Sequence, residues 1–555
     1  MIVGAFLFTI KSLAFQFSPR TIKDDVIYIN DNTSFGEQMI KENTAYVIQS
    51  SIDLKGDTIL IPKNCRLAFY GGVLKNGGIK GENTSISSSE KQIFENVVIT
   101  GLWNNAKVYP EWFGAKGDGV NDDSDAIQQA ANMAFGHQLH FVPMGRYLCK
   151  KGITLKSNTE VYGNGATVIK ACYPSIFRNE HYNEDIIDTN INIYGLKGET
   201  LDNNYRGLWL WLVGVNSTCI DNCSFSNNTP IDQKEQPQWC ITVSGENIEI
   251  SNSYINTRGG GAFSDGIHLY NSSNCKIHDC EIFTDDDCLG FCPEIPEEQR
   301  TFSKYNNPSE NIEIYDNVFA SKNNCIRFEI RENAPKRFYY GNVKIHDIRL
   351  GVKTLEVGSF LYIHDYRNNS TTKNSNFRIG NVFCEGYFNS LRRNFIEIYG
   401  KNPELLPTGV CNITDVSISG INVNMKGFND FISVIGARNI ELKNSTFGEA
   451  SDSKTGLTIR DCLKIDVTDC HFTTHTPYTF LNIVNSSGRI SNNQIIRGAF
   501  ANNAGVGLSV DEYSSQMVIE GNHFTNFAIG MSDRRKQNKK EKNKFVKCNL
   551  NRKLM

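Results

Sequence analysis

A short pattern that recurs along the chain from about residue 190 onward restricts its fold more than any other feature of the sequence. Each copy opens with Asn, continues with alternating apolar residues and meets Asn or Asp again before a closing apolar residue. The clearest copies are NIEISNSYI (247–255), NCKIHDCEI (274–282), NIEIYDNVF (311–319), NVKIHDIRL (342–350) and NIELKNSTF (439–447). Looser copies lie at 217–225, 463–472 and 516–524.

The spacing of these copies predicts a parallel β-helix. The starts at 247, 274, 311 and 342 lie 27, 37 and 31 residues apart, as expected for successive coils with loops of variable length. Alternation turns one face of each strand inward, and Asn and Asp are favoured at bends. Equivalent residues then stack from coil to coil into an apolar column. The fold class is therefore all-β; the alternative is a β-sandwich of many short strands.

The sixteen cysteines fit this repeat better than they fit a disulfide framework. Cys223, Cys280 and Cys470 occupy the same column of the repeat, where small buried residues belong, and Cys serves readily as a small hydrophobe. We therefore assign no disulfide pair, although a few bridges are compatible with the sequence.

The first residues resemble a signal for export. We expect a signal peptide over 1–20, because the apolar run Ile2–Ile10 is too short to span a bilayer and small residues follow it. A basic segment before the run is missing, and the alternative is an ordinary first β-strand. On the export interpretation the protein acts in the periplasm, at the cell surface or outside the cell.

Three further regions follow. Residues 21–107 form an N-terminal β accessory module, in which short strands are broken by Gly and Asn turns. The β-helix domain extends over 108–530. Residues 531–555 are a basic C-terminal tail or a last coil.

A short helix is predicted between the module and the coils. Asp122–Phe135 carries a small apolar face, and Asp122 with Asp125 three residues later makes a start like a capping box. A β-helix exposes core at its end, and such a helix is suited to cover it. The coils then begin within His140–Tyr147.

The region around this helix resembles a known superfamily. GAKGDGVNDDSDAIQQA, followed by FVPMGRYL and VYGNGATVI, is similar to the N-terminal region of pectate-lyase-like proteins, which include polysaccharide lyases, rhamnogalacturonan-active enzymes and phage tailspikes. The resemblance implies a right-handed β-helix and says little about chemistry. The preceding module with VYPEWFGAKGDG resembles proteins of gut Bacteroidetes, a group rich in glycan-degrading enzymes.

Acidic residues gather in the stretch Ser264–Cys288. Asp265 precedes Asp286 by 21 residues, about one coil, so the acids belong on neighbouring strands roughly 4.8 Å apart. Carboxylates held that close cannot all ionise freely, and at least one pKa should rise. An acid and a base facing each other are what glycosidic hydrolysis requires. The alternative is that these Asp residues only form turns, but three consecutive Asp would repel one another there.

The same stretch resembles the active-site motifs of glycoside hydrolase family 28, the polygalacturonases and their relatives. SDG (264–266) and DDC (286–288) are similar to its N-T-D-G and (G/Q)-D-D-C motifs. The resemblance implies that Asp286 is the general acid, and that Asp265 and Asp287 activate the attacking water with inversion at the anomeric carbon. Inversion calls for carboxyl groups roughly 6.5–9.5 Å apart, which acids on adjacent strands can provide.

The sequence also departs from that family. Asp285 stands where Gly or Gln is usual, Asn323 stands where a His is expected, and the Arg-Ile-Lys motif is missing. Arg327 is the nearest cation on the coil after the acids, and Lys322 or Arg331 can assist it. Binding of galacturonan in the usual way is thus in doubt, and another glycan is favoured.

Aromatic residues near the acids have two interpretations each. His268 is a substrate contact or an outward surface residue. Trp239, with Trp209 and Trp211 on neighbouring coils, stacks on sugar or belongs to the core. We treat Asp285, His268, Asn323, Arg327, Lys322 and Trp239 as the predicted substrate-binding set.

These features favour an exported, inverting glycoside hydrolase without a cofactor, acting on a pectic or other acidic polysaccharide. A net charge of −3 gives no reason to expect nucleic acid as a partner. A polysaccharide lyase is the second candidate; its acids would bind Ca²⁺ and Arg327 would abstract a proton. The third is a glycan-binding or tailspike-like protein without catalysis. The sequence leaves the sugar, the cleavage pattern and the oligomeric state open.

Overall fold

The structure is a computed structural model that describes most of the chain. The described residues are 25–201, 208–226, 239–259, 264–293, 295, 297–351, 356–367, 372–384, 387–388, 394–400, 411–424, 431–450, 456–475, 478–498, 504–514, 516–535 and 542–554. The predicted signal peptide over 1–20 lies outside them and stays a prediction. The chain divides into two compact units, one formed by residues up to 104 except 90–92, the other by 90–92 and the rest.

The first unit is a small parallel β module. Its strands are β1 (Asp25–Tyr28), β2 (Thr44–Ile48), β3 (Ile52–Asp53), β4 (Thr58–Leu60), β5 (Arg66–Phe69), β6 (Leu74–Ser87) and β7 (Phe94–Trp103), with the one-turn helix α1 (Phe35–Gln38). All their pairings are parallel, in the order β1-β2-β5-β6-β3, with β4 and β7 also on β6. Its core includes Tyr46, Ile48, Leu67 and Ile79.

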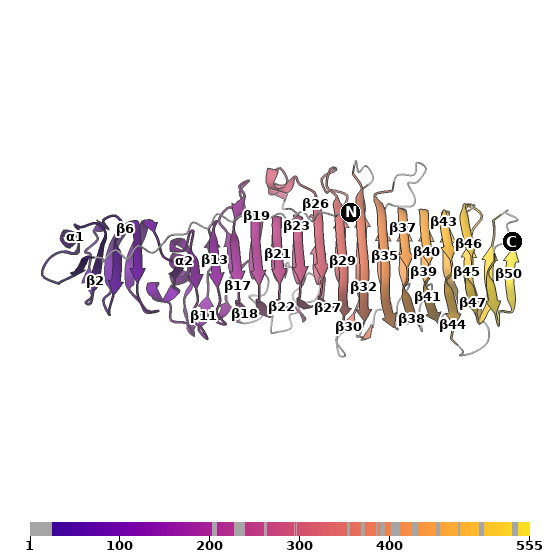
Figure 1. Cartoon of the computed structure of the whole chain (residues 1–555), viewed down its shortest axis with the longest axis horizontal. Helices are drawn as coiled ribbons and strands as arrows, with labels where there is room; N and C mark the ends of the chain where they lie inside the picture. The colour runs from indigo at the N-terminus through magenta and orange to yellow at the C-terminus, as the bar shows by residue number, and fades with distance from the viewer. Residues whose placement is uncertain are drawn as a thin grey trace, which may run out of the picture. The chain divides into compact units, whose positions relative to one another are not determined.

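The second unit is the predicted parallel β-helix. It starts with β8 (Lys107–Val108), the 3-10 turn η1 (Pro110–Phe113), β9 (Asp118–Asp122) and helix α2 (Ser124–Met133). The first coils follow as β10 (Gln138–His140), β11 (Arg146–Cys149), β12 (Ile153–Leu155), β13 (Thr159–Tyr162), β14 (Thr167–Lys170), β15 (Phe177–Asn179), β16 (Asp188–Thr189), β17 (Ile191–Tyr194), β18 (Lys197–Thr200) and β19 (Leu210–Asp221). In Figure 1 the strands of this unit succeed one another side by side up to β50. Strand pairing therefore begins well before 190, where the repeat becomes legible in the sequence.

Parallel pairing arranges the later strands in three rows. The first row, which carries the acids, holds β25 (Leu289–Phe291), β28 (Asn324–Ile330), β31 (Ser359–Asp365), β34 (Ile396–Tyr399), β36 (Ile432–Ile435), β39 (Leu457–Arg460), β42 (Thr479–Val484), β45 (Ala504–Val510), β48 (Phe527–Asp533) and β50 (Leu550–Leu554). The long strands β21 (Ile241–Ser251) and β23 (Ile267–His278) contribute their first residues to it.

The other two rows complete each coil. The second row holds the ends of β21 and β23, then β26 (Ser309–Tyr315), β29 (Tyr340–Leu350), β32 (Asn374–Cys384), β35 (Ile413–Asn424), β37 (Ala437–Lys443), β40 (Leu463–Thr468), β43 (Gly488–Ser491) and β46 (Met517–Glu520). The third holds β20 (Ser224–Ser226), β22 (Tyr254–Asn256), β24 (Glu281–Thr284) and β27 (Val318–Ser321), and then the last residues of β29, β32 and β35. It continues with β38 (Thr446–Ala450), β41 (His471–Thr474), β44 (Gln494–Arg497), β47 (His523–Thr525) and β49 (Lys544–Val546). A separate pair is β30 (Glu356–Val357) with β33 (Tyr387–Phe388), and two 3-10 turns are η3 (Glu297–Gln299) and η4 (Ser303–Tyr305).

The apolar column predicted from the repeat lies in the second row, where the register partners Ile250, Ile277, Ile314, Ile345, Ile379, Ile418, Leu442, Val467, Ile490 and Ile519 are all buried. A second column forms the core of the first row. Consecutive register partners are all buried: Ile241, Ile267, Leu289, Ile326, Leu361, Ile396, Ile432, Leu457, Leu481 and Leu508. Each such side chain contributes roughly 1.5–3 kcal/mol by burial. The partner of one residue is the equivalent residue of the next coil, so the register is fixed coil by coil.

Asn residues build the bends. Asn274, Asn311 and Asn342 have φ of 51°, 57° and 51°, in the left-handed region that Asn tolerates better than most residues. Their amides also form a ladder. Asn311 Nδ2 donates to Asn274 Oδ1 at 3.0 Å, and Asn342 Nδ2 donates to Asn311 Oδ1 at 2.6 Å. The Asn of the repeat thus has two roles: it tolerates the left-handed backbone of the bend, and its side-chain amide bonds to the equivalent Asn of the next coil.

One detail differs from the sequence interpretation, and one alternative that the sequence left open is decided. Helix α2 begins at Ser124 with Asp123 as its N-cap residue, not Asp122. The Asp123 carboxylate accepts hydrogen bonds from the backbone of Lys116 and Gly117, at 2.6 and 3.1 Å, and so holds the Gly-rich loop; Asp122 Oδ1 accepts from Ser124 N at 3.1 Å. Trp209 is fully buried and stacks on Phe225, so its place is in the core.

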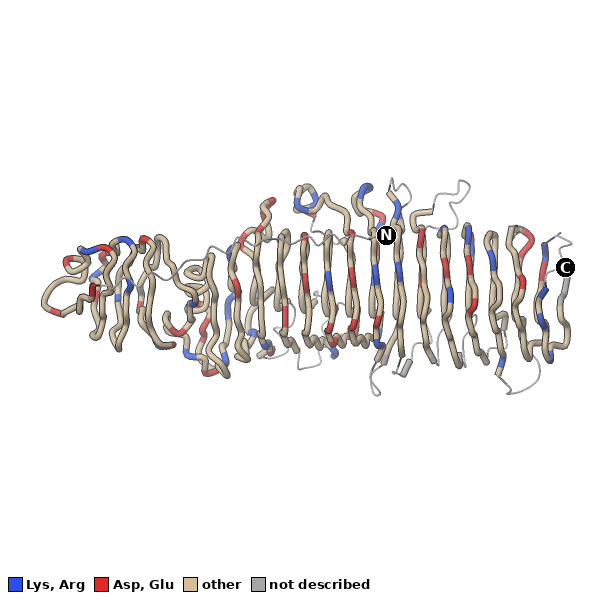
Figure 2. Tube along the Cα trace, in the orientation of Figure 1, with Lys and Arg blue, Asp and Glu red and all other residues tan. Residues whose placement is uncertain are grey.

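None of the sixteen cysteines, all of which lie in the described residues, forms a disulfide, and most are buried. Cys223, Cys280 and Cys470 are among the buried ones, as their shared column predicts. Both signs of charge are interspersed along the coils in Figure 2. In the part of the chain that the structure describes, no helix is long and apolar enough to cross a bilayer.

Replacing Asn311 by Ala should destabilise the β-helix by about 2 kcal/mol. The change removes the ladder hydrogen bonds and places an ordinary Cβ in the left-handed region. Asn311→Gly is the matched control, because Gly keeps that backbone conformation while the ladder is lost. Thermal unfolding should give the order wild type, Asn311→Gly, Asn311→Ala; equal melting temperatures for the two variants would contradict the backbone requirement.

Candidate active site

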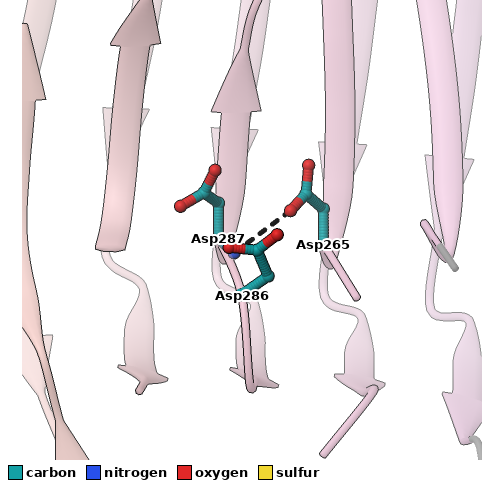
Figure 3. A group of neighbouring side chains, drawn as sticks. All are labelled: Asp265, Asp286 and Asp287. Atoms are coloured by element: carbon teal, nitrogen blue, oxygen red, sulfur yellow. Dashed lines mark hydrogen bonds between the residues drawn. The ribbon is translucent and has the colours of Figure 1, made fainter. Parts of the chain in front are cut away.

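Asp265 and Asp287 lie at equivalent places on neighbouring coils. Each stands two residues before a first-row strand segment, and those segments pair Ile267 with Leu289. The backbone N–H of Asp287 donates to Asp265 Oδ1 at 3.1 Å, the contact drawn as a dashed line in Figure 3. Both side chains are buried. The coil spacing inferred from the sequence therefore does bring acids of two coils together.

Asp286 completes the cluster and is its most accessible member. One carboxylate oxygen from each of Asp265, Asp286 and Asp287 lies within 4.8 Å of the others. Asn323 Nδ2 donates to Asp286 Oδ1 at 2.5 Å and reaches Asp287 Oδ1 at 3.4 Å. The residue that replaces the expected His is thus in the site and binds two of the acids.

Asp287 is buried in an ion pair. Arg327 Nε lies 2.7 Å from Asp287 Oδ2, and Asn324 Nδ2 donates to Asp287 Oδ1 at 2.7 Å. Burial raises the pKa of the Asp287 carboxyl well above its usual range; Arg327 opposes this rise, and the carboxylates of Asp265 and Asp286 reinforce it. The cluster therefore retains a proton at pH values where isolated carboxyls have lost theirs.

His268 supports Asp265 from below the surface. Its Nδ1 lies 2.9 Å from Asp265 Oδ2, and its ring stacks on Trp239 with centroids 3.8 Å apart and planes 4° from parallel. The side chain is fully buried. The interpretation of His268 as an outward surface residue is therefore wrong, because Trp239 covers it. Its contact is with an acid of the cluster.

Asp285 turns to a different set of partners. Its Oδ2 accepts a hydrogen bond from Gly259 N at 2.7 Å, and its Oδ1 lies 2.8 Å from Lys322 Nζ. The Lys322 side chain is 50% exposed. The sequence put Asp285, Asp286 and Asp287 into one acidic group, and the structure joins the last two to Asp265 while Asp285 fixes the neighbouring backbone.

The coil after the acids adds residues that the sequence did not point to. Glu329 Oε2 lies 3.3 Å from Arg327 Nη1 and 3.6 Å from Arg331 Nε. Glu329, Arg331 and Cys292 line a cavity of about 290 Å³. Asn324 and Glu329 went unnoticed because neither matches a family motif. Only Glu329, two residues after Arg327 on β28, follows the strand alternation that was a usable signal.

The acids do not fit a Ca²⁺ site of the kind expected for a lyase. Calcium takes 6–8 oxygen ligands, but Asp287 Oδ2 faces the Arg327 guanidinium and Asp265 Oδ2 faces His268. Arg327 thus supplies positive charge at the place where a cation would bind. The same ion pair keeps Arg327 protonated, so it is a poor proton-abstracting base here.

Two family models match the chain. One, described as rhamnogalacturonase A/epimerase, pectate lyase-like, matches residues 111–286. The other, described as right handed beta helix region, matches residues 404–551. The first spans α2 and the coils up to Asp286, and the second spans the later coils.

Curated relatives and solved structures resemble parts of the chain. A preneck appendage protein of Bacillus phage PZA is 38% identical over 116 residues, which are 20% of this chain and 13% of that protein. A polygalacturonase of Arabidopsis thaliana is 26% identical over 205 residues, which are 32% of this chain and 45% of that protein. This chain therefore spans less than half the length of either relative.

Among solved structures, a family 28 exopolygalacturonase of Yersinia enterocolitica is 14% identical, with a TM-score of 0.41 and coverage of 66% of this chain and 79% of that one. The tailspike of E. coli bacteriophage HK620 is 11% identical, with a TM-score of 0.46 and coverage of 80% and 78%. The chain has the pectate-lyase-like right-handed β-helix fold. Its similarity to family 28 polygalacturonases and to phage appendage proteins is distant.

A carboxyl of this cluster should stay protonated well above pH 4, near which an isolated Asp ionises. Because the folded-state pKa of Asp287 is raised, its proton is kept as pH rises and lost only at the higher folded-state value. Infrared titration in D₂O should show the protonated-carboxyl band persisting in the wild type and weaker in Asp287→Asn, where Glu111 and Asp123, whose pKa values burial also raises, still contribute.

Asp316→Asn is the control for this titration, since Asp316 is exposed on a bend of the next coil. That variant should keep the band. Complete loss of the wild-type band by about pH 4, the usual range for Asp, would contradict the retained proton.

Proposed function

We propose that this chain is a carbohydrate-active enzyme that hydrolyses glycosidic bonds of a polysaccharide. The observation that carries the proposal is the convergence of Asp265, Asp286 and Asp287 within 4.8 Å, from two neighbouring coils, with a proton retained among them. Hydrolysis needs one carboxyl that donates a proton and one that activates water. The distant polygalacturonase relatives support the same chemistry.

Asp286 is the proposed general acid. It is the member of the cluster that solvent reaches, and Asn323 positions its carboxyl group through a hydrogen bond to Oδ1. Asp265, oriented by His268, is the proposed base for the attacking water, and Asp287, oriented by Asn324 and Arg327, is proposed to hold that water in place. Protonation of the leaving oxygen and attack by water then break the C–O bond without a covalent intermediate.

The stereochemistry is open to a direct test. The resemblance to family 28 favours inversion, for which carboxyl groups roughly 6.5–9.5 Å apart are typical. The nearest oxygens here lie within 4.8 Å, so a water that attacks must sit above the cluster and not between its members. We propose inversion; the anomer released in the first turnovers, read by proton NMR, decides it.

A glycan-binding protein without catalysis is the second candidate. The observation that favours it is the identity of 38% to a phage preneck appendage protein over 116 residues. Such a protein would retain its glycan and generate no new chain ends. The proposed export from the cytoplasm suits both candidates, because polysaccharides are met outside the cell.

Asp286→Asn should lower hydrolysis by about 10²–10⁴-fold, because it removes the proton donor while preserving size and most contacts. The assay follows reducing ends and unsaturated-uronate absorbance together on a panel of pectic and other polysaccharides. New reducing ends without unsaturation, lost in the variant, are the expected result.

Asp316→Asn is the matched control and should retain full activity, since Asp316 lies on an exposed bend. A chelator should leave the wild-type rate unchanged, because Arg327 provides the positive charge at the acids. Unsaturated products that disappear with chelator would overturn hydrolysis in favour of a lyase. Glycan retention with no new ends on any substrate would favour the binding protein.

A further inference from the structure

A second polar cluster lies on the same row of strands, next to the acids. Arg327 of β28 pairs in register with Tyr362 of β31, and Tyr362 pairs with Glu397 of β34. Neighbouring strands are roughly 4.8 Å apart, so Tyr362 lies one strand and Glu397 two strands beyond Arg327. A glycan that passes over the acids along this row must therefore cross Tyr362 and Glu397.

The cluster is a continuous network. His364 Nε2 lies 3.0 Å from Glu397 Oε1, and His364 Nδ1 lies 2.7 Å from the Tyr366 hydroxyl. The Tyr366 and Tyr362 hydroxyls lie 2.6 Å apart, and Asn394 Nδ2 donates to Glu397 Oε2 at 2.8 Å. Such a network holds hydroxyl and carboxylate groups in fixed positions, as a sugar-binding surface requires.

Part of the network reaches solvent. The Glu397 side chain is 30% exposed, and Tyr362, Tyr366 and Tyr399 are half-buried. The His364 ring is buried and stacks on Tyr362 at 3.5 Å and on Tyr399 at 5.2 Å. Aromatic edges, hydroxyls and one carboxylate are thus presented together beside Arg327.

The electrostatics here disfavour a negatively charged sugar. Three cations of the coil after the acids are engaged: Lys322 with Asp285, Arg327 with Asp287 and Glu329, and Arg331 with Glu329. Arg300 is a fourth cation and lines the cavity of Glu329 and Arg331. Carboxylates outnumber these cations once Asp265, Asp286 and Glu397 are included. Burial lowers the pKa of His364, so the ring is neutral near pH 7 and does not offset Glu397.

We propose that the sugar unit bound beside Tyr362, His364 and Glu397 is uncharged, so that the chain acts on a glycan that offers a neutral sugar at this position. This inference rests on the proposed function of the same site. Carboxylates accept hydrogen bonds from sugar hydroxyls, whereas a uronate there would meet Glu329 and Glu397, and Lys322, Arg327 and Arg331 are already paired with carboxylates. It replaces the acidic substrate expected from the family resemblance.

Binding is measured on Asp286→Asn, which holds a glycan without cleaving it. The ligands are tetragalacturonate and its carboxyl-reduced counterpart, which share backbone and linkage and differ in charge, together with neutral galactan, xylan and glucan tetrasaccharides. Calorimetry should show at least about tenfold tighter binding of a neutral ligand than of tetragalacturonate, equivalent to 1.4 kcal/mol.

Second-site variants locate the discrimination. Adding Glu397→Gln to Asp286→Asn should reduce the ratio between the Kd of tetragalacturonate and the Kd of its carboxyl-reduced counterpart at least about threefold, because one repelling charge is gone. Glu313→Gln, on the second row and paired with Lys344, is the matched control and should leave the difference unchanged. Salt should weaken the discrimination, since it screens charge.

Two outcomes overturn the inference: tetragalacturonate binding as tightly as its reduced counterpart, or no neutral ligand binding at all. Failure of the neutral-sugar inference is distinguishable from failure of the proposed hydrolysis. Neutral ligands that bind but are never cleaved by the wild type uphold the inference and refute hydrolysis. Cleavage of tetragalacturonate in preference to every neutral ligand upholds hydrolysis and refutes the inference.

Discussion

In-register parallel pairing is the constraint on which the rest of this structure depends. Each residue of a strand faces its equivalent on the next coil at about one strand spacing, so equal positions always become neighbours. Inside the coils this produces a continuous column of Ile and Leu. Just before the first-row segments, it brings Asp265 against Asp287, and both side chains are buried. The geometry that favours apolar residues in the core thus also forces two buried carboxyl groups together.

Polar and charged side chains around the acids offset the repulsion between these carboxyl groups. Arg327 and Asn324 contact Asp287, His268 contacts Asp265, and Asn323 bridges Asp286 and Asp287. A buried carboxylate without partners would cost several kcal/mol, and with these partners the cluster is held with a proton retained. Burial and neighbouring like charges destabilise the fold locally. The same two effects shift the pKa values of the carboxyl groups, so that an acid and a base can stand at one place.

The sequence predicted the features that pairing controls directly. The Asn pattern gave the bends, the alternation gave the inward column, and the 21-residue spacing gave the meeting of two acidic coils. It did not predict which partners each of the three consecutive acids contacts. These acids lie in the turn between β24 and β25, where strand alternation no longer fixes the direction of a side chain. Asp285 turns to Lys322 there, and Asp287 turns to Arg327.

Contacts between residues on different coils were equally hard to predict from the sequence. Trp239 and His268 stack across two coils, so nothing in either local sequence shows that His268 is covered. The network of His364 and Glu397 joins two further coils through contacts that no motif marks. Its place became visible only when the register set Tyr362 beside Arg327.

Mass spectrometry of products formed in heavy-oxygen water tests the central claim most directly, because hydrolysis is the step at which solvent oxygen enters the glycan. If the three acids form a hydrolytic site, each cleaved bond yields one new reducing end that carries a single heavy oxygen. Products with an unsaturated end and no incorporated oxygen, or an unchanged glycan that stays bound, would contradict the account.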